Sequence, residues 1–278
     1  MTVLALLLDR LLGEPPTVMH PVVGFGALMG AVERRMYTDS RVTGALYTAF
    51  GVAIGASSAL VAPRWLSTYV AVAGRALWAE ASGVAAALEA GDIALSRERL
   101  PALVGRDPTD LDVEEIVRAT VESVAENTVD AIVAPYLWGR VNLAGAYRAV
   151  NTMDAMVGHR SDRYRRFGWA SARLDDAANY LPARVTAALV AAVRPAASGR
   201  VLHAVRVQAP AHPSPNAGVA EAAFAAALGL RLGGTNRYGN RTETRPVLGD
   251  GRVAEPRDIG RAVALSQHVT VALALAAP

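Results

Sequence analysis

The chain contains no cysteine and no lysine. Without cysteine it can form no disulfide, no thiolate nucleophile and no cysteine-ligated zinc or iron–sulfur site. Without lysine it lacks the residue that a Walker-type phosphate loop or a Schiff-base enzyme requires. All 28 basic residues are arginine. Any cationic clamp on a phosphate must therefore be a guanidinium group, which binds phosphates and carboxylates through paired hydrogen bonds.

Charge is scarce as well. Only 19% of the 278 residues are charged and 52% are hydrophobic, whereas a soluble domain is nearer ~25% charged. The mean hydropathy is +0.24. This composition indicates contact with lipid. The net charge of +3 is typical of a membrane protein with arginine-rich cytoplasmic loops. Because aromatic residues are few and no recognition motif is visible, we expect no nucleic-acid partner.

One apolar stretch is long enough to cross a bilayer. Gly44–Ala62 has no charged residue over 19 positions, close to the ~20 that a membrane helix needs. Within it, Gly51 and Gly55 have the spacing of small residues that lets helices approach closely. More arginines precede this stretch than follow it, which favours a cytoplasmic N-terminal side. Other apolar stretches are shorter or interrupted by charges, and they cover residues 1–12, 66–87, 129–150, 183–193 and 261–277.

We therefore expect an all-α, polytopic integral membrane protein with about four or five membrane helices and polar helical loops. The N-terminal apolar run meets Asp9-Arg10 and a proline-rich turn, so we expect no cleavable signal. A single membrane-embedded domain over residues 1–278 is expected, with a polar, site-bearing block at about 104–184.

Within the polar block, residues 112–134 predict a helix. Asp112 followed by Glu115 is a capping-box pattern, and Pro135 predicts the helix end. Glu122, Glu126 and Asp130 step by four residues, so they share one face, opposite a face of valines. Two interpretations stay open. The face is either solvated, with Arg118 pairing Glu122, or it is a Mg²⁺ site, since Mg²⁺ takes one or two carboxylates plus substrate phosphates.

Residues 151–184 are rich in arginine and in Asp and Asn. Asn151 and Asp154 lie one helical turn apart, and Arg173, Asp176 and Asn179 recur at three-residue spacing, with Asp175 beside them. A positive cytoplasmic loop explains the arginines on its own. Paired carboxylates beside an apolar stretch are costly unless partnered, which favours a functional role. His159 is interpreted as a loop residue.

The C-terminal third has two further features. Ser214–Gly218 precedes an alanine-rich helix that we expect over 219–232, so Ser214 or Asn216 is a candidate N-cap and the helix start a candidate anion site. Residues 233–239 predict a turn by composition. Near the N-terminus, His20 precedes Pro21 in a short amphipathic region.

Taken together, these segments resemble the adenosylcobinamide-phosphate synthase family of cobalamin synthesis, called CobD or CbiB. The matching segments occur in the same order as in the family and together extend over nearly the whole chain. The matching segments are LLLDRLLGEPP with HPVVGFG (6–26), VGRDPTDLD (104–112), ESVAENTVDAIVAP (122–135), YRAVNTMDAMVGHRSDRYRRFGWASARLDDAANYLPAR (147–184), SPNAGVAEAAFAAALGLRLGG (214–234) and NRYG (236–239).

The resemblance implies a multi-pass protein of the bacterial inner membrane that acts as an ATP-dependent amide ligase. Such an enzyme joins (R)-1-aminopropan-2-ol, or its O-phosphate, to a propionate carboxylate of adenosylcobyric acid and gives adenosylcobinamide or its phosphate. The partners are then the corrinoid, the amino alcohol and the lipid bilayer. ATP and Mg²⁺ are expected as co-substrate and metal, with no permanently bound cofactor. The oligomeric state stays open.

Amide formation from a carboxylate needs activation, most simply by ATP, and phosphoryl transfer needs Mg²⁺ and cationic clamps. We assign hypothetical roles accordingly. The catalytic candidates are Glu122, Glu126, Asp130, Asp175, Asp176 and His20, of which a carboxylate or the histidine serves as base. The metal candidates are Glu126, Asp130 and Asp176. The substrate-binding candidates are Asn127, Asn151, Asp154, Arg160, Arg163, Arg173, Asn179, Arg184, Asn216, Asn236 and Tyr238.

Two other classes of function are kept as alternatives. A non-catalytic, AmpE-like inner-membrane regulatory protein would form no cobinamide product and no ADP. A corrinoid transporter is expected to show paired inverted repeats with broken helices, and the sequence shows no internal repeat.

Overall fold

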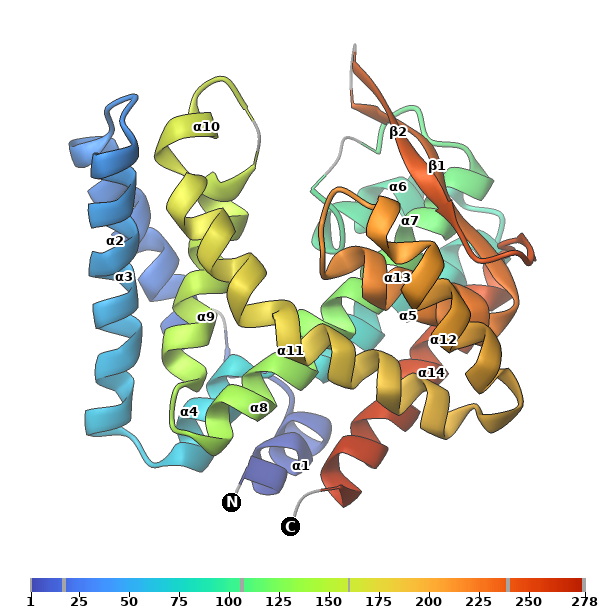
Figure 1. Cartoon of the computed structure of the whole chain (residues 1–278), viewed down its shortest axis with the longest axis horizontal. Coiled ribbons are helices and arrows are strands. Elements are labelled where there is room, and N and C mark those ends of the chain that lie inside the picture. Colours follow the sequence, from blue (N-terminus) through green and yellow to red (C-terminus); the bar gives the residue numbers. More distant parts are fainter. Residues whose placement is uncertain (1, 17–18, 106–107, 160, 239–240, 277–278) are drawn as a thin grey trace. The chain divides into compact units, whose positions relative to one another are not determined.

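The computed structural model describes residues 2–16, 19–105, 108–159, 161–238 and 241–276, and at 235–238 and 241–243 it describes the backbone alone. The described chain is mostly helical, as expected. It forms two compact units, coloured along the sequence in Figure 1. Unit 1 contains Met1–Gly74 and Asp130–Tyr180, and unit 2 contains Arg75–Val129 and Leu181–Pro278. The expected single membrane-embedded domain stays a prediction.

Unit 1 is helical throughout its described part. Its core is formed by large side chains of α2, α3, α9 and the segments after α9, including Met29, Tyr47 and Phe167. The elements are α1 (Thr2–Leu12), α2 (Pro21–Met36), α3 (Arg41–Val61), α4 (Arg64–Ala71), η3 (Val129–Val133), α8 (Ala134–Arg140), α9 (Ala144–Met153), η4 (Asp154–Gly158), α10 (Tyr164–Phe167) and the first half of α11 (Trp169–Val193).

Small residues let α3 pack closely on α9. A Cβ atom on Gly51 would overlap the Met153 side chain, and one on Gly55 would lie 2.5 Å from Ala149 Cβ and 2.6 Å from Gly145 O. Both are closer than side chains tolerate. The small-residue spacing seen in the sequence is therefore confirmed as a helix-packing device.

Two π-helical turns carry residues of the polar block. The helix that begins after Asp112 does not end at Pro135: α7 (Val113–Thr128) runs into the π turn η3, and α8 follows with Pro135 in its first turn. The wider turn accommodates the proline without ending the helical path, which corrects the predicted boundary. The second π turn, η4, begins at Asp154. Such turns are frequent at functional sites.

Unit 2 surrounds two buried helices, α7 and α13. Every residue of α13 from Gly218 to Ala226 is buried. The elements are α5 (Gly74–Glu89), α6 (Ile93–Arg99), η2 (Leu100–Ala102), α7, the second half of α11, η5 (Pro195–Ala197), α12 (Ser198–Val207), η6 (Ala209–Ala211), α13 (Ala217–Leu228), β1 (Leu230–Tyr238), β2 (Arg241–Leu248), β3 (Arg252–Val253) and α14 (Pro256–Leu275).

Hydroxyl groups join α5, α7 and α14 inside unit 2. Ser266 accepts a hydrogen bond from Trp78 Nε1 at 2.9 Å and one from the Thr128 hydroxyl at 2.8 Å. At the start of α14, Asp258 is fully buried and binds two guanidinium groups, those of Arg252 and Arg261. This pairing lowers the pKa of Asp258, although burial alone would raise it.

The segment after α13 is a strand, where the sequence predicted a helix to 232 and then a turn. Helix α13 ends at Leu228 because Gly229 adopts a left-handed φ of 67°. Strand β1 then pairs antiparallel with β2 and, in parallel, with β3. Gly233 and Gly234 have φ of 81° and 97° and lie where the register shifts, so they form a bulge in the strand rather than a turn.

One helix of the described chain, α3, is long and apolar enough to cross a membrane. A second candidate is the pair of α11 and Pro195–Ala211, which is bent by 111°. These are fewer than the four or five membrane helices expected. The stretch 66–87 breaks into α4 and α5, and 129–150 breaks into η3, α8 and α9. Membrane location stays a prediction.

Replacing Gly55 with valine should destabilise unit 1 by roughly 1–3 kcal/mol, because the added atoms would overpack the contact of α3 with α9. The measurement is the unfolding midpoint of the purified protein in detergent. Gly24→Ala is the matched control. A Cβ at Gly24 meets no atom within 4 Å, so this change should raise stability by up to ~1 kcal/mol. A wild-type midpoint for Gly55→Val would contradict the packing account.

Candidate functional site

The carboxylates of α7 are the first candidate group. The predicted capping box is confirmed, since Asp112 Oδ1 accepts from the Glu115 amide at 2.8 Å and Glu115 Oε2 accepts from the Asp112 amide at 3.0 Å. Farther along, Glu122 is 4% exposed and accepts a 2.9 Å hydrogen bond from the Gly233 amide. Arg118 Nε lies 3.9 Å from the same carboxylate. Glu122 is therefore not part of a solvated face.

The acidic residues of unit 1 meet around the side chain of Asn151. Its Nδ2 donates to Asp130 Oδ2 and to Asp175 Oδ1, both at 3.3 Å. Asn179 Nδ2 donates to the other oxygen of Asp175 at 2.9 Å. The buried Tyr147 hydroxyl donates to Asn179 Oδ1 at 2.9 Å. We call these five residues the Asn151 network. It brings together four predicted site residues, and Tyr147 is an addition that the sequence did not suggest.

Asp154 and Asp176 lie near this network. Burial, and then the charges of Asp175 and Asp176, raise the pKa of Asp154 to about 7. The Asp154 carboxyl is therefore half protonated near neutral pH. Asp176 forms the predicted pair with Arg173 at 3.9 Å. Because Arg173 is 77% exposed, this pair adds little stability, and its guanidinium is accessible from solvent.

Arg163, in the described part of the loop after η4, contacts Glu33 and Tyr37 rather than the Asn151 network. Arg163 binds Glu33 Oε1 at 2.8 Å and stacks 4.0 Å above the Tyr37 ring. Arg160, another predicted ligand, lies outside the described residues. His159 stacks edge-on against Tyr164, in keeping with a loop histidine.

Arg148 is the guanidinium that reaches the network. Its Nη1 donates to Asn151 Oδ1 at 3.3 Å, and its buried Nε makes no hydrogen bond within the described part of the chain. Arg148 also lines a cavity of about 390 Å³ whose walls are mostly apolar and come from α2, α3, α4 and α9. The sequence signal that could have indicated a function for Arg148 is its charge inside the apolar stretch 129–150.

His20 caps a helix. Its Nδ1 accepts a 3.2 Å hydrogen bond from the Val22 amide at the start of α2, and its Nε2 lies 3.5 Å from Glu14. No contact of His20 with the Asn151 network occurs among the described residues. A structural role explains this histidine, and its role as a base stays a prediction.

A second acidic group lies inside unit 2 and contains a residue that sequence reasoning missed. Glu221 of α13 is fully buried, and its carboxylate interacts with the side chains of Glu126 and Arg245. His212 Nε2 is 3.7 Å from Glu221 Oε1, beyond hydrogen-bond distance. Burial, and then the charges of Glu126 and Glu122, raise the pKa of Glu221 well above its ordinary value.

His212 is held by the Ser214 backbone. Its Nδ1 lies 3.1 Å from the Ser214 amide nitrogen and 3.1 Å from the Ser214 carbonyl oxygen. The signal that could have revealed Glu221 is its isolation. It is the single charged residue in the sequence AGVAEAAFAAAL of α13.

Other predicted site residues lie elsewhere in unit 2. Arg184 Nη1 donates to Asn216 Oδ1 at 2.9 Å, so these two candidates are brought together. At the start of α13, the side chain that accepts backbone amides is Ser214, from Asn216 and Ala217. Asn127 donates to Ser123 at 3.0 Å. The side chains of Asn236 and Tyr238 lie outside the described part of the structure.

The described residues do not form a complete metal site. Among the described residues, no three His, Asp or Glu side chains are grouped so that they could hold one metal ion. Two carboxylates do share a donor, because Asp130 and Asp175 both accept from Asn151. Mg²⁺ often uses one or two carboxylates and takes its other ligands from water and phosphate. The roles of Glu126, Asp130 and Asp176 as metal ligands stay predictions.

The fold and these groups define a mostly helical protein with an apolar helix, buried carboxylates in both units and arginine as its only strong cation. The model of the family described as "CobD/Cbib protein" matches residues 2–266. The chain belongs to this family.

Curated relatives agree with this assignment. Proteins named "Cobalamin biosynthesis protein CobD" from Mycobacterium tuberculosis and Chromobacterium violaceum are 44% and 45% identical to the chain, covering 98% and 99% of it and 92% and 95% of their own lengths. A protein of the same name from Rhodobacter capsulatus is 38% identical over 99% of the chain and 95% of its own length. No solved structure matches the chain.

The raised pKa of Asp154 predicts a pH dependence of stability. The folded protein keeps this proton up to about pH 7, whereas the unfolded chain loses it near pH 4. Rising pH therefore favours unfolding between about pH 4 and 7, by a few kcal/mol, and has no further effect above that window. The measurement is the denaturation midpoint against pH in metal-free buffer. Asp154→Asn should flatten the decline, and an equally steep decline in that variant would refute the assignment.

Proposed function

We propose that the chain takes part in cobalamin biosynthesis as an ATP-dependent amide ligase, an adenosylcobinamide-phosphate synthase. It would join (R)-1-aminopropan-2-ol or its O-phosphate to a propionate carboxylate of adenosylcobyric acid. The observation that carries the proposal is family membership over residues 2–266, together with the names of the relatives. The buried carboxylates of both units and the purely arginine-based cations support it.

The reaction needs two displacements. A propionate oxygen attacks the γ-phosphorus of ATP, which forms an acyl phosphate and releases ADP. The amine nitrogen then attacks the acyl carbon, which forms the C–N bond and expels phosphate, while one proton leaves the nitrogen. The chain must therefore bind phosphates with cations, exclude water from the acyl phosphate and accept a proton.

The Asn151 network and its surroundings can perform part of this work. Asp130 and Asp175 offer carboxylate oxygens on either side of one amide donor, and one or two carboxylates together with substrate phosphates commonly hold Mg²⁺. Such an ion would neutralise phosphate charge during transfer. Arg148 is placed between this network and the apolar cavity, where it can bind a carboxylate of a substrate whose body is largely apolar. Asp154, with a pKa of about 7, is suited to accept a proton at neutral pH.

The proposed setting is the bacterial inner membrane, with several membrane segments. Helix α3 supports this because large apolar side chains remain exposed along it, among them Leu46, Phe50 and Leu60. A helix in the core of a soluble protein would have them buried.

Glu126→Gln and Asp176→Asn should each lower the rate of ligation by about 100-fold or more, because each removes a charge assigned to phosphate, metal or proton handling. The measurement is cobinamide product and ADP formed by purified protein in detergent from adenosylcobyric acid, ATP-Mg²⁺ and the amino alcohol, free or phosphorylated. Glu89→Gln, an exposed charge removal on α5, is the control. Near-normal turnover in both variants would refute the assignment, and wild-type protein without product would favour a non-catalytic role.

Phe50→Arg should strongly reduce the amount of protein recovered in carbonate-washed membranes. An arginine at the middle of a membrane helix costs roughly 2.5–3.5 kcal/mol on insertion scales, whereas an exposed site of a soluble protein would tolerate it. Val42→Arg, at the start of the same helix and 70% exposed, is the control because its side chain can reach the interface. Equal recovery of both variants would argue against a membrane-spanning α3.

A further inference from the structure

Arginines gather at the end of unit 1 where α2 passes into α3. The described segments 33–41 and 161–169 contain six arginines against three acidic residues. Figure 1 shows α10, which belongs to the second segment, beside this end of α3. Side chains of Arg41, Arg165 and Arg166 line one open hollow of about 480 Å³. We call it the arginine hollow.

Most of the charge in the arginine hollow has no carboxylate beside it. Arg165 forms no hydrogen bond or ion pair within the described chain. The guanidinium of Arg41 has no ion pair there either, and it lies 5.9 Å from the centre of the Trp169 ring. Arg166 is 3.6 Å from Asp39, but both side chains are more than half exposed, so this pair is weak. The hollow therefore keeps a positive charge that an anion from outside the chain can neutralise.

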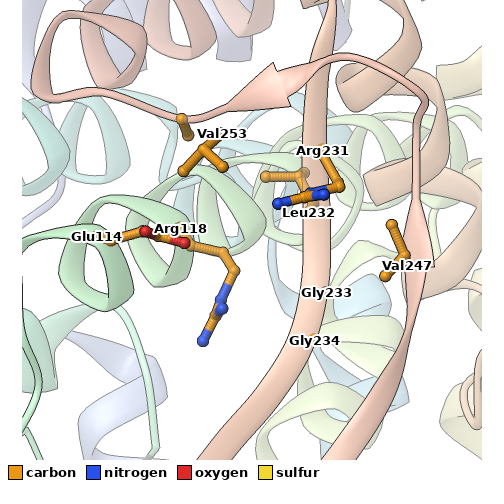
Figure 2. Close-up of a pocket in the computed structure, with 9 residues that line it drawn as sticks. Glu114, Arg118, Arg231, Leu232, Gly233, Gly234, Val247 and Val253 are labelled. Atoms are coloured by element: carbon orange, nitrogen blue, oxygen red, sulfur yellow. The ribbon is translucent and has the colours of Figure 1, made fainter.

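A cavity in unit 2, between α7 and β1, also has two guanidinium groups but differs in this respect (Figure 2). It is smaller, about 140 Å³, and Glu114 lines it together with Arg118 and Arg231. Arg118 also pairs with Glu122 at 3.9 Å. Carboxylates of the chain itself thus lie beside these groups, whereas the described lining of the arginine hollow contains no acidic residue.

An apolar face of α3 begins at the arginine hollow. Arg41, which lines the hollow, is the first residue of α3. Val42, Leu46 and Phe50 follow at four-residue spacing with exposed side chains, so they share one face of a helix that is long enough to cross a membrane. Trp169 donates a 3.0 Å hydrogen bond to Arg41 O and is exposed at the same end. Tryptophan is typical of the boundary between lipid and water.

We propose that the arginine hollow binds the headgroup of an anionic phospholipid, with an acyl chain along the exposed face of α3. Guanidinium groups bind phosphate oxygens through paired hydrogen bonds. A phospholipid supplies both an anion and an apolar chain, whereas a free phosphate would use the hollow alone. Basic clusters beside a membrane helix attract the anionic lipids of the cytoplasmic leaflet, which is the side that the sequence favours for the start of α3. The inference rests on the proposed membrane setting and is independent of the ligase chemistry.

The test is tryptophan fluorescence of the full-length protein in phosphatidylcholine vesicles. A fraction of the lipid is replaced by phosphatidylglycerol, or by phosphatidylcholine, with bromine near the headgroup end of its acyl chains, and bromine quenches tryptophans in close contact. Subtracting the signal of Trp169→Phe protein isolates Trp169. Brominated phosphatidylglycerol should quench Trp169 with at least about tenfold higher affinity than brominated phosphatidylcholine, because its headgroup has a net negative charge.

Variants then assign this preference to the arginine hollow. Arg165→Gln should lower the preference about fivefold, since one basic residue at an anionic membrane surface contributes about that factor. The double variant Arg165→Gln, Arg166→Gln should abolish it. Arg165 has no partner in the described chain, so its replacement should not disturb folding. Arg64→Gln is the matched control, because it removes an exposed arginine just beyond the other end of α3 and should leave the preference unchanged.

Equal quenching of Trp169 by the two brominated lipids would overturn the inference, as would a preference that the double variant keeps. Relief of quenching by inorganic phosphate or ATP at matched ionic strength would also overturn it, because the hollow would then bind a soluble anion. Absence of quenching by either lipid would contradict both the lipid site and the membrane setting of α3. Formation of amide product is measured separately, so the ligase function can stand or fall without the lipid site.

Discussion

Carboxylates buried without an equal supply of buried cations are the constraint on which the rest of this structure depends. Taking an ionised carboxylate out of water costs several kcal/mol even after relaxation, so each one needs hydrogen-bond donors, a proton or a ligand. In unit 1 the amides of Asn151 and Asn179 supply donors to Asp130 and Asp175. In unit 2 the backbone of β1 supplies a donor to Glu122, and burial with the nearby charges of Glu126 and Glu122 raises the pKa of Glu221.

The backbone is adapted to the same requirement. Asp154 begins a π-helical turn and Asp130 lies within another, and the wider turns change the direction of these side chains relative to a regular α-helix. The bulge at Gly233 turns an amide out of the strand ladder toward Glu122. Close packing of α3 on α9 holds the latter helix, which carries Asn151, in place. Helix packing, the π turns and the bulge thus all help to position these acidic groups.

Local features of the fold could be predicted from the sequence, and distant pairings could not. The capping box at Asp112 and the packing role of Gly55 follow from spacing within one helix, so pattern alone indicates them. The strand β1 was missed because Gly233-Gly234 has turn-like composition, whereas the pairing that makes it a strand involves β2, farther along the chain. Of the predicted acidic residues, Glu122 is buried and the others are half-buried. Glu221 and Arg148 were missed because their importance depends on neighbours from other helices.

The most direct test of this account is the titration of Glu221. Infrared difference spectra of wild-type and Glu221→Gln protein, recorded against pH, would isolate the carbonyl band of its protonated carboxyl group. The account predicts that this band persists well above the pH at which an ordinary glutamate ionises, because burial and the charges of Glu126 and Glu122 raise the pKa of Glu221. A band that is lost in the ordinary range of a glutamate carboxyl would contradict it.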